Sequence, residues 1–151
     1  MRRRNTERHD VLRQSDLFAE ATDDQLEAAA ALLTPVRVRS GQVLVRQGGI
    51  GSEFLVLVDG EVDVNRIDGD GVTALATLGS GDFVGEMALL GNAARTASVV
   101  ARTPVTALVA NPREFRSLLD AVPSADRRVR AAAYRRRGAL EGNLVTEGTA
   151  A

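Results

Sequence analysis

Residues 83–99 contain the side chains whose types and spacing best suit chemistry. Gly85 has no Cβ atom, so a ligand can approach its backbone, and it can adopt positive φ angles that turn N–H groups toward one point. A short apolar turn of helix is expected at residues 87–90, and the first N–H groups of a helix lack internal partners and lie at the positive end of its dipole. Arg95 adds a forked guanidinium, which fits phosphate oxygens. The stretch therefore predicts an anion-binding site.

Glu86 indicates what accompanies that anion. A carboxylate repels a phosphate unless its task is to accept hydrogen bonds from neutral hydroxyl groups on the same ligand. Glu86 or Arg95 alone is more often a surface charge. Together, beside a helical turn flanked by strands, they favour a phosphate next to hydroxyls. That is the chemistry of a sugar phosphate, and so of a nucleotide.

Gly-Glu-Met-Ala-Leu-Leu at residues 85–90, followed by Arg-Thr-Ala-Ser-Val at residues 95–99, resembles the phosphate-binding cassette of cyclic nucleotide-binding domains. The resemblance covers about residues 12–140, and one departure is Ala94, where many members have proline. It implies that the carboxylate binds the ribose 2′-hydroxyl, the arginine binds the exocyclic phosphate oxygens, and backbone amides supply the rest. The ligand-binding residues that it implies are Gly85, Glu86, Met87, Ala88, Arg95, Thr96 and Ala97.

The resemblance implies cyclic AMP or cyclic GMP as the ligand, and we expect cyclic AMP. Thr96 does not decide between them, because its hydroxyl can bond the amino group of a syn guanine, yet members that respond mainly to cyclic AMP also have threonine there. On a regular strand Arg95 and Thr96 would face opposite ways, so both reach one ligand only if Arg95 belongs to the loop. Tyr134 or Arg135 is the expected lid over the purine.

The elements around the cassette predict a mainly β fold with flanking helices. From residue 35 the hydrophobic period is two, and short strands alternate with glycine turns, as in an antiparallel jelly-roll β-barrel. Residues 54–58 are continuously apolar, which predicts a strand covered on both faces. Asp59-Gly60 predicts a hairpin, and residues 68–71 predict another turn. The short cassette helix falls between two of the later strands.

One N-terminal and two C-terminal helices complete the prediction. Thr22 and Gln25 form a capping box before a helix over residues 23–33, and Asn111-Pro112 starts a helix that ends at Pro123. Ser124 is expected to cap a last helix to about residue 137, and the resemblance implies that this helix closes over the ligand. We expect the ligand-binding domain to span residues 12–141, with flexible termini at 1–11 and 142–151.

Composition excludes several function classes. The 151 residues suffice for one domain, and 44% hydrophobic residues, 26% charged residues and a net charge of -1 are typical of an ordinary globular protein. Without cysteine there are no disulfides or thiolate chemistry, and because all 19 basic residues are arginines there is no lysine for a Schiff base or a Walker motif. No apolar run is long enough to span a membrane, and the arginine-rich start lacks a following apolar segment, so we expect a cytoplasmic protein. His9, the only histidine, is expected to be solvated.

The alternatives belong to other classes. A cupin-type enzyme normally holds a metal with histidines inside the barrel. Because the only histidine, His9, lies outside the predicted barrel, neither a metal nor catalysis is expected. A transcription regulator of the catabolite activator kind needs a helix-turn-helix beyond the last helix, so this chain would be part of a longer protein. A barrel that has lost its ligand would act as an interaction module. Asp68 and Asp70 resemble only a fragment of a calcium loop, and Glu61 with Asp63 is expected to be an exposed polar pair.

The arginines of the last helix are expected to form a solvated face rather than a nucleic-acid surface, because aromatic partners for bases are nearly absent. The expected partner is the cyclic nucleotide, with neither nucleic acid nor a membrane span. A homodimer or an effector protein bound through the C-terminal helices stays open, as does the effector's identity.

Overall fold

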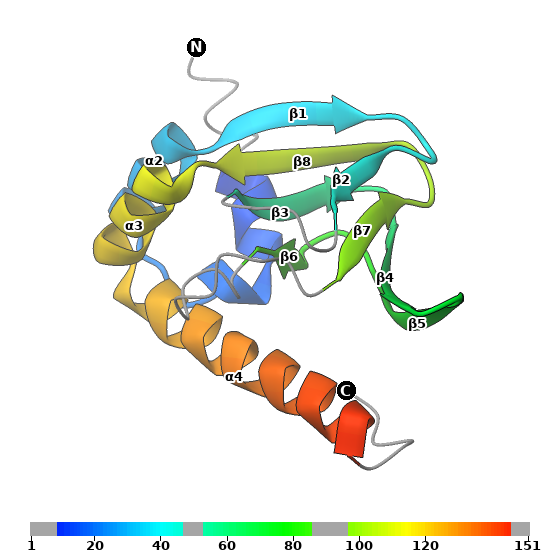
Figure 1. The fold of residues 1–151 in the computed structure, drawn as a ribbon. Helices are drawn as coiled ribbons and strands as arrows, with labels where there is room; N and C mark the ends of the chain where they lie inside the picture. Colours follow the sequence, from blue (N-terminus) through cyan, green and yellow to red (C-terminus); the bar gives the residue numbers. More distant parts are fainter. Residues whose placement is uncertain (1–8, 47–52, 86–96, 146–151) are drawn as a thin grey trace.

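The computed structural model describes residues 9–46, 53–85 and 97–145, with side chains up to residue 136. Its strands form two four-stranded antiparallel sheets (Figure 1). The first sheet has the order β1 (Thr34–Val38), β8 (Val105–Ala110), β3 (Phe54–Asp59) and β6 (Phe83–Val84). The second has the order β2 (Val43–Val45), β7 (Ser98–Ala101), β4 (Val62–Asp68) and β5 (Gly71–Leu78).

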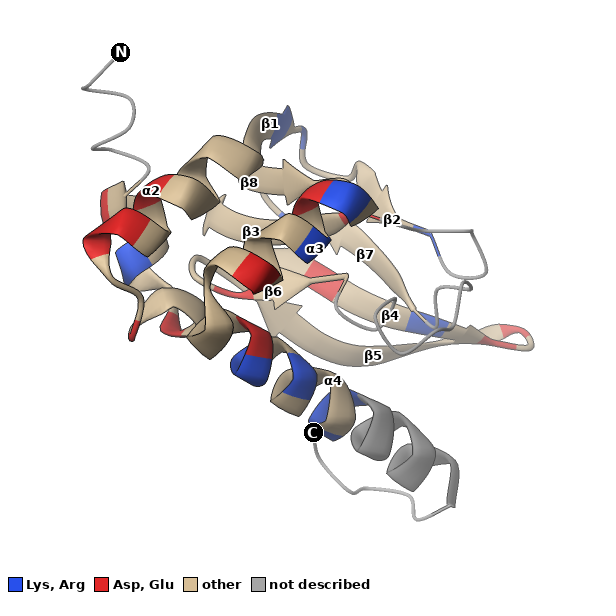
Figure 2. Ribbon diagram, turned by 90° about the vertical axis from the view of Figure 1, so that its left-hand side faces the viewer, with Lys and Arg blue, Asp and Glu red and all other residues tan. Residues whose placement is uncertain are grey.

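Helices flank the first sheet. They are a helical segment at residues 9–14, the 3-10 helix η1 (Asp16–Phe18), α2 (Asp23–Leu32), α3 (Pro112–Ala121) and α4 (Pro123–Val145). Figure 2 shows α2 and α3 in front of the sheets and α4 running below them. The mainly β fold with flanking helices is confirmed, although the strand pairings among the described residues form two sheets and no closed barrel.

Local sequence explains where the helices begin. Thr22 accepts from the Gln25 N–H while the Gln25 side chain accepts from the Thr22 N–H, and Asn111 and Glu114 form the same capping box at α3. Pro112 occupies the first turn of α3, where a missing N–H costs no hydrogen bond. Both predicted caps are confirmed.

β3 is covered on both faces, as its apolar run predicts. Phe54 and Val56 are buried in a cluster with the helices, whereas Leu55 and Leu57 are buried in a second cluster between the sheets. This alternation follows from the period of two along a strand. β3 therefore joins both hydrophobic cores and fixes the sheets relative to the helices.

Three local expectations differ from the structure. Asp59-Gly60 makes a turn, but it carries the chain from β3 in one sheet to β4 in the other, so it is not a hairpin. α4 begins at Pro123, which places Ser124 inside its first turn rather than at the cap, and α4 continues to Val145. The helical segment at residues 9–14 begins within the expected flexible lead, where Val11 packs against the core.

Candidate functional site

Gly85 is the first cassette residue and follows β6 directly. Its φ is +104°, and a Cβ atom there would lie 2.3 Å from the carbonyl oxygen of Glu53 and 3.0 Å from the Cα of Phe54. No side chain fits at that distance, and the positive φ is a conformation that L residues rarely adopt. The expected positive φ angle is confirmed, and the missing Cβ atom makes room for the Glu53 backbone; the approach of a ligand to Gly85 stays a prediction.

The central cassette residues Glu86, Met87, Ala88, Arg95 and Thr96 lie outside the described residues. Gly85 and the half-buried Ala97 are the described ends of the segment. Between them the chain passes from β6, at the edge of the first sheet, to β7, an inner strand of the second. The predicted site thus falls on a connection between the two sheets.

The chain that enters the cassette is held in place by hydrogen bonds. The Leu57 N–H donates to the Asp82 carbonyl at 2.8 Å, and the Gly81 N–H donates to the Leu57 carbonyl at 2.8 Å. From the other side, the buried Ser15 hydroxyl donates to the Gly81 carbonyl at 2.6 Å. Val84 then pairs with Leu55 of β3. Gly85 therefore starts from a backbone fixed both to η1 and to β3.

An aromatic series continues from this strand into the helices. The Phe83 and Phe54 rings lie 5.7 Å apart, and the Phe54 ring stacks on Phe115 of α3 at 4.2 Å. On the α4 side, Arg136 donates from Nη1 to the Phe83 carbonyl at 2.8 Å, and its guanidinium carbon lies 4.9 Å from the centre of the Phe83 ring. Sequence reasoning missed both Phe83 and Arg136. The available signal was the helical spacing that places position 136 on the buried face of α4.

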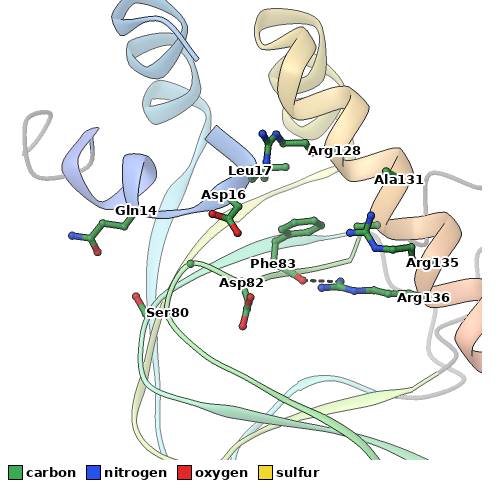
Figure 3. Close-up of a pocket in the computed structure, with 12 residues that line it drawn as sticks. Gln14, Asp16, Leu17, Ser80, Asp82, Phe83, Arg128, Ala131, Arg135 and Arg136 are labelled. Atoms are coloured by element: carbon green, nitrogen blue, oxygen red, sulfur yellow. Dashed lines mark hydrogen bonds between the residues drawn. The ribbon is translucent and has the colours of Figure 1, made fainter. Parts of the chain in front are cut away.

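A cavity of about 390 Å³ lies between α4, η1 and the turn before β6 (Figure 3). Asp16 and Asp82 lie on one side, and Arg128, Arg135 and Arg136 extend from α4 on the other. Arg128 also forms an ion pair with Glu20 at 3.4 Å. The arginines of α4 were expected to form a solvated face. Arg136 differs, because its guanidinium contacts Phe83.

The two candidates for the lid have different surroundings. Tyr134 is 73% exposed on α4, whereas Arg135 is exposed at the rim of the cavity. A role for Tyr134 or Arg135 over the purine stays a prediction. His9, expected to be solvated, is half-buried, and its Nε2 is buried with no hydrogen-bond partner among the described residues.

One member of each acidic pair accepts hydrogen bonds from neighbouring side chains. Asp68 accepts from Arg66 of its own strand at 3.1 Å and from Thr73 of β5 at 3.3 Å, and Asp63 accepts from Thr77 of β5 at 3.1 Å. Within the described residues, no group of three or more His, Cys, Asp or Glu side chains could hold a metal ion. In that same part of the chain, no helix has the length and apolar character needed to cross a membrane.

The chain is similar to known proteins in sequence and in fold. A model of the cyclic nucleotide-binding domain family matches residues 35–122. Acetyltransferase Pat of Mycolicibacterium smegmatis is 36% identical over 120 residues, covering 80% of this chain and 36% of that protein. A cAMP-dependent protein kinase regulatory subunit of Colletotrichum orbiculare is 34% identical over 121 residues, covering 80% of this chain and 30% of that protein. The crystal structure of the Thermus thermophilus catabolite activator protein is similar with a TM-score of 0.77 and 27% identity, covering 87% of this chain and 63% of that one.

Two antiparallel sheets with flanking helices, linked through a connection that starts at a left-handed glycine, define a mainly β domain. The family match covers more than half of the chain and includes the whole predicted cassette. The chain belongs to the cyclic nucleotide-binding domain family. It spans about a third of the length of the two curated relatives, 36% of one and 30% of the other.

Proposed function

We propose that this chain is a regulatory sensor that binds a cyclic nucleotide, cyclic AMP in preference to cyclic GMP, in the cassette at residues 85–97. The observation that carries the proposal is Gly85, because its φ is +104° and a Cβ atom there would lie only 2.3 Å from the Glu53 carbonyl, which excludes any larger residue at the start of the cassette. The family match over residues 35–122 supports the same site. The 34% identity to a cAMP-dependent protein kinase regulatory subunit and the 33% identity to a cGMP-dependent protein kinase support a cyclic nucleotide ligand, and the preference for cyclic AMP is part of the proposal.

Each site residue has a role in this proposal. Glu86 accepts a hydrogen bond from the ribose 2′-hydroxyl, and Arg95 donates to the exocyclic phosphate oxygens. Backbone amides from Gly85 to Ala88 and around Thr96 and Ala97 complete the anion site. Tyr134 or Arg135 covers the purine.

Binding is communicated through α4. The bound phosphate fixes the cassette, the apolar side chains Met87, Leu89 and Leu90 repack, and the helix that starts at Pro123 changes position. A ligand can shift this equilibrium only by its difference in affinity for the two arrangements. No catalytic step is part of the proposal. The domain at residues 12–141 would act on an effector, or on a second copy of the chain, through its C-terminal helices, in the cytoplasm.

Replacing Arg95 with alanine tests the site. We expect a loss of about 2–5 kcal/mol of binding free energy, because the phosphate would be desolvated without its charged partner. Isothermal titration calorimetry with cyclic AMP, cyclic GMP and linear AMP measures it. Arg102→Ala, an exposed arginine just beyond β7, is the matched control. Equal affinity of the Arg95→Ala variant and the parent would reject this mode of binding.

A further inference from the structure

One face of α4 is buried along its first turns. Ala125 and Val129 belong to the core cluster that includes β3 and the other helices, and Ala132 and Ala133 are buried further along. The spacing of three and four residues keeps these positions on the same face of the helix. The next position on that face is Arg136. An arginine thus follows the apolar stripe at the point where α4 passes the strand before the cassette.

Arg136 contacts that strand in two ways. Its Nη1 donates to the Phe83 carbonyl at 2.8 Å, a charge-assisted hydrogen bond, and its guanidinium lies over the Phe83 ring at 4.9 Å from the centroid. The second contact is a cation–π interaction, which requires the flat face of an aromatic ring. The position of this part of α4 is therefore specified by both the backbone and the side chain of one residue.

Phe83 is a fixed point of the molecule. Its ring packs 5.7 Å from Phe54, which stacks on Phe115 at 4.2 Å, and its backbone pairs with Val56 of β3. Phe83 also lies two residues before Gly85. The hydrogen bond from Arg136 therefore connects α4 directly to the backbone that positions the first residue of the cassette.

The surroundings of Arg136 leave room for α4 to change position. The cavity of about 390 Å³ separates this stretch of the helix from η1 and the turn before β6, and α4 lines it with the small side chains Ala131 and Ala132 beside its arginines. Figure 3 shows the Arg136 side chain reaching along the cavity to Phe83. A helix next to an open space is held in place by those contacts that bridge the space, and the Arg136–Phe83 contact is one of them.

We infer that Arg136 is a positioning residue for nucleotide binding: its contact with Phe83 holds α4 in the arrangement that binds the nucleotide tightly. The inference rests on the proposed function and adds a residue outside the cassette that sets the affinity of the site. Arg136 itself does not touch the ligand. It acts by favouring one position of α4, so its removal reduces the fraction of molecules that are ready to bind.

The test compares Arg136→Ala, Arg136→Lys and Arg130→Ala in the full chain. Isothermal titration with cyclic AMP and cyclic GMP is expected to give a Kd about 3- to 10-fold weaker for Arg136→Ala, as one partly exposed charge-assisted contact is lost. Arg136→Lys should recover part of the affinity, since an ammonium can also lie over the ring and donate to the carbonyl. Arg130→Ala should bind like the parent, because Arg130 pairs with Asp126 of its own helix at 2.8 Å.

Hydrogen exchange without nucleotide gives a second measurement. Arg136→Ala should speed amide exchange in α4 around residue 136, whereas Arg130→Ala should not, and urea unfolding shows whether each variant is folded. If Arg136→Ala does not fold, Arg136→Lys and Arg136→Gln are compared in its place. Binding by Arg136→Ala as tight as the parent's, or tighter, overturns the inference. If the parent binds neither nucleotide, the proposed function fails. In that case, unchanged amide exchange in Arg136→Ala separately overturns the positioning role of Arg136.

Discussion

Gly85 lies against a neighbouring backbone segment, whereas Gly41 has free space beside it. Gly41 and Gly85 both have positive φ angles, +86° and +104°. A Cβ atom at Gly41 would meet nothing within 4 Å, whereas one at Gly85 would meet the Glu53 carbonyl at 2.3 Å. The two positions therefore separate the cost of a left-handed conformation from the cost of crowding against β3.

We expect Gly85→Ala to be the more damaging of the two substitutions. The conformational cost alone is about 1–3 kcal/mol at either site, and at Gly85 the Glu53 backbone must also move, which would displace β6 and the cassette. Urea unfolding should show a larger loss of stability for Gly85→Ala than for Gly41→Ala, and calorimetry should show lost nucleotide binding only for the former. Equal losses at the two positions would mean that the close approach to Glu53 does not matter.

At the scale of elements, the start of α3 positions Phe115, whose ring stacks on Phe54 at 4.2 Å. Asn111→Ala removes one half of the capping box and leaves the Glu114 N–H without its acceptor, which should cost about 1 kcal/mol. Asn111→Ser keeps a capping oxygen and is the control. Chemical denaturation measures both variants, and a serine variant as unstable as the alanine variant would show that the side-chain cap is not the cause.

The elements also show what the sequence could and could not predict. Capping boxes and the two-faced β3 were predicted, because they depend on neighbours within four residues or on a simple alternation. The turn at Asp59-Gly60 was expected to be a hairpin, because a local signal specifies a reversal but not which sheet the next strand joins. The Arg136–Phe83 contact joins positions 53 residues apart, and no local pattern encodes such a pairing. The anion site was predicted from residue types and spacing, and its central residues stay a prediction.

At the scale of the whole molecule, β3 belongs to both hydrophobic clusters, so neither core can separate without exposing the other. A single domain connected in this way is expected to unfold in one cooperative transition. Ligand binding at residues 85–97 should therefore stabilise the entire domain and not one sheet. At a concentration one hundred times its Kd, a ligand that binds only the folded state adds about 2.7 kcal/mol of stability.

That stabilisation should raise the midpoint of thermal unfolding by about 5–10 °C for a chain of this size. Differential scanning calorimetry with cyclic AMP, cyclic GMP and linear AMP measures the shift for each ligand. Cyclic AMP should give the largest shift, and linear AMP should give almost none, because its phosphate lacks the ring closure that the cassette is proposed to hold. The Arg95→Ala variant should lose the shift while keeping the midpoint of the free protein, since its effect is on the ligand. Two separate unfolding transitions, with the nucleotide raising the midpoint of only one, would contradict the coupling of both cores through β3. Equal midpoint shifts with linear and cyclic AMP would contradict the proposed ligand.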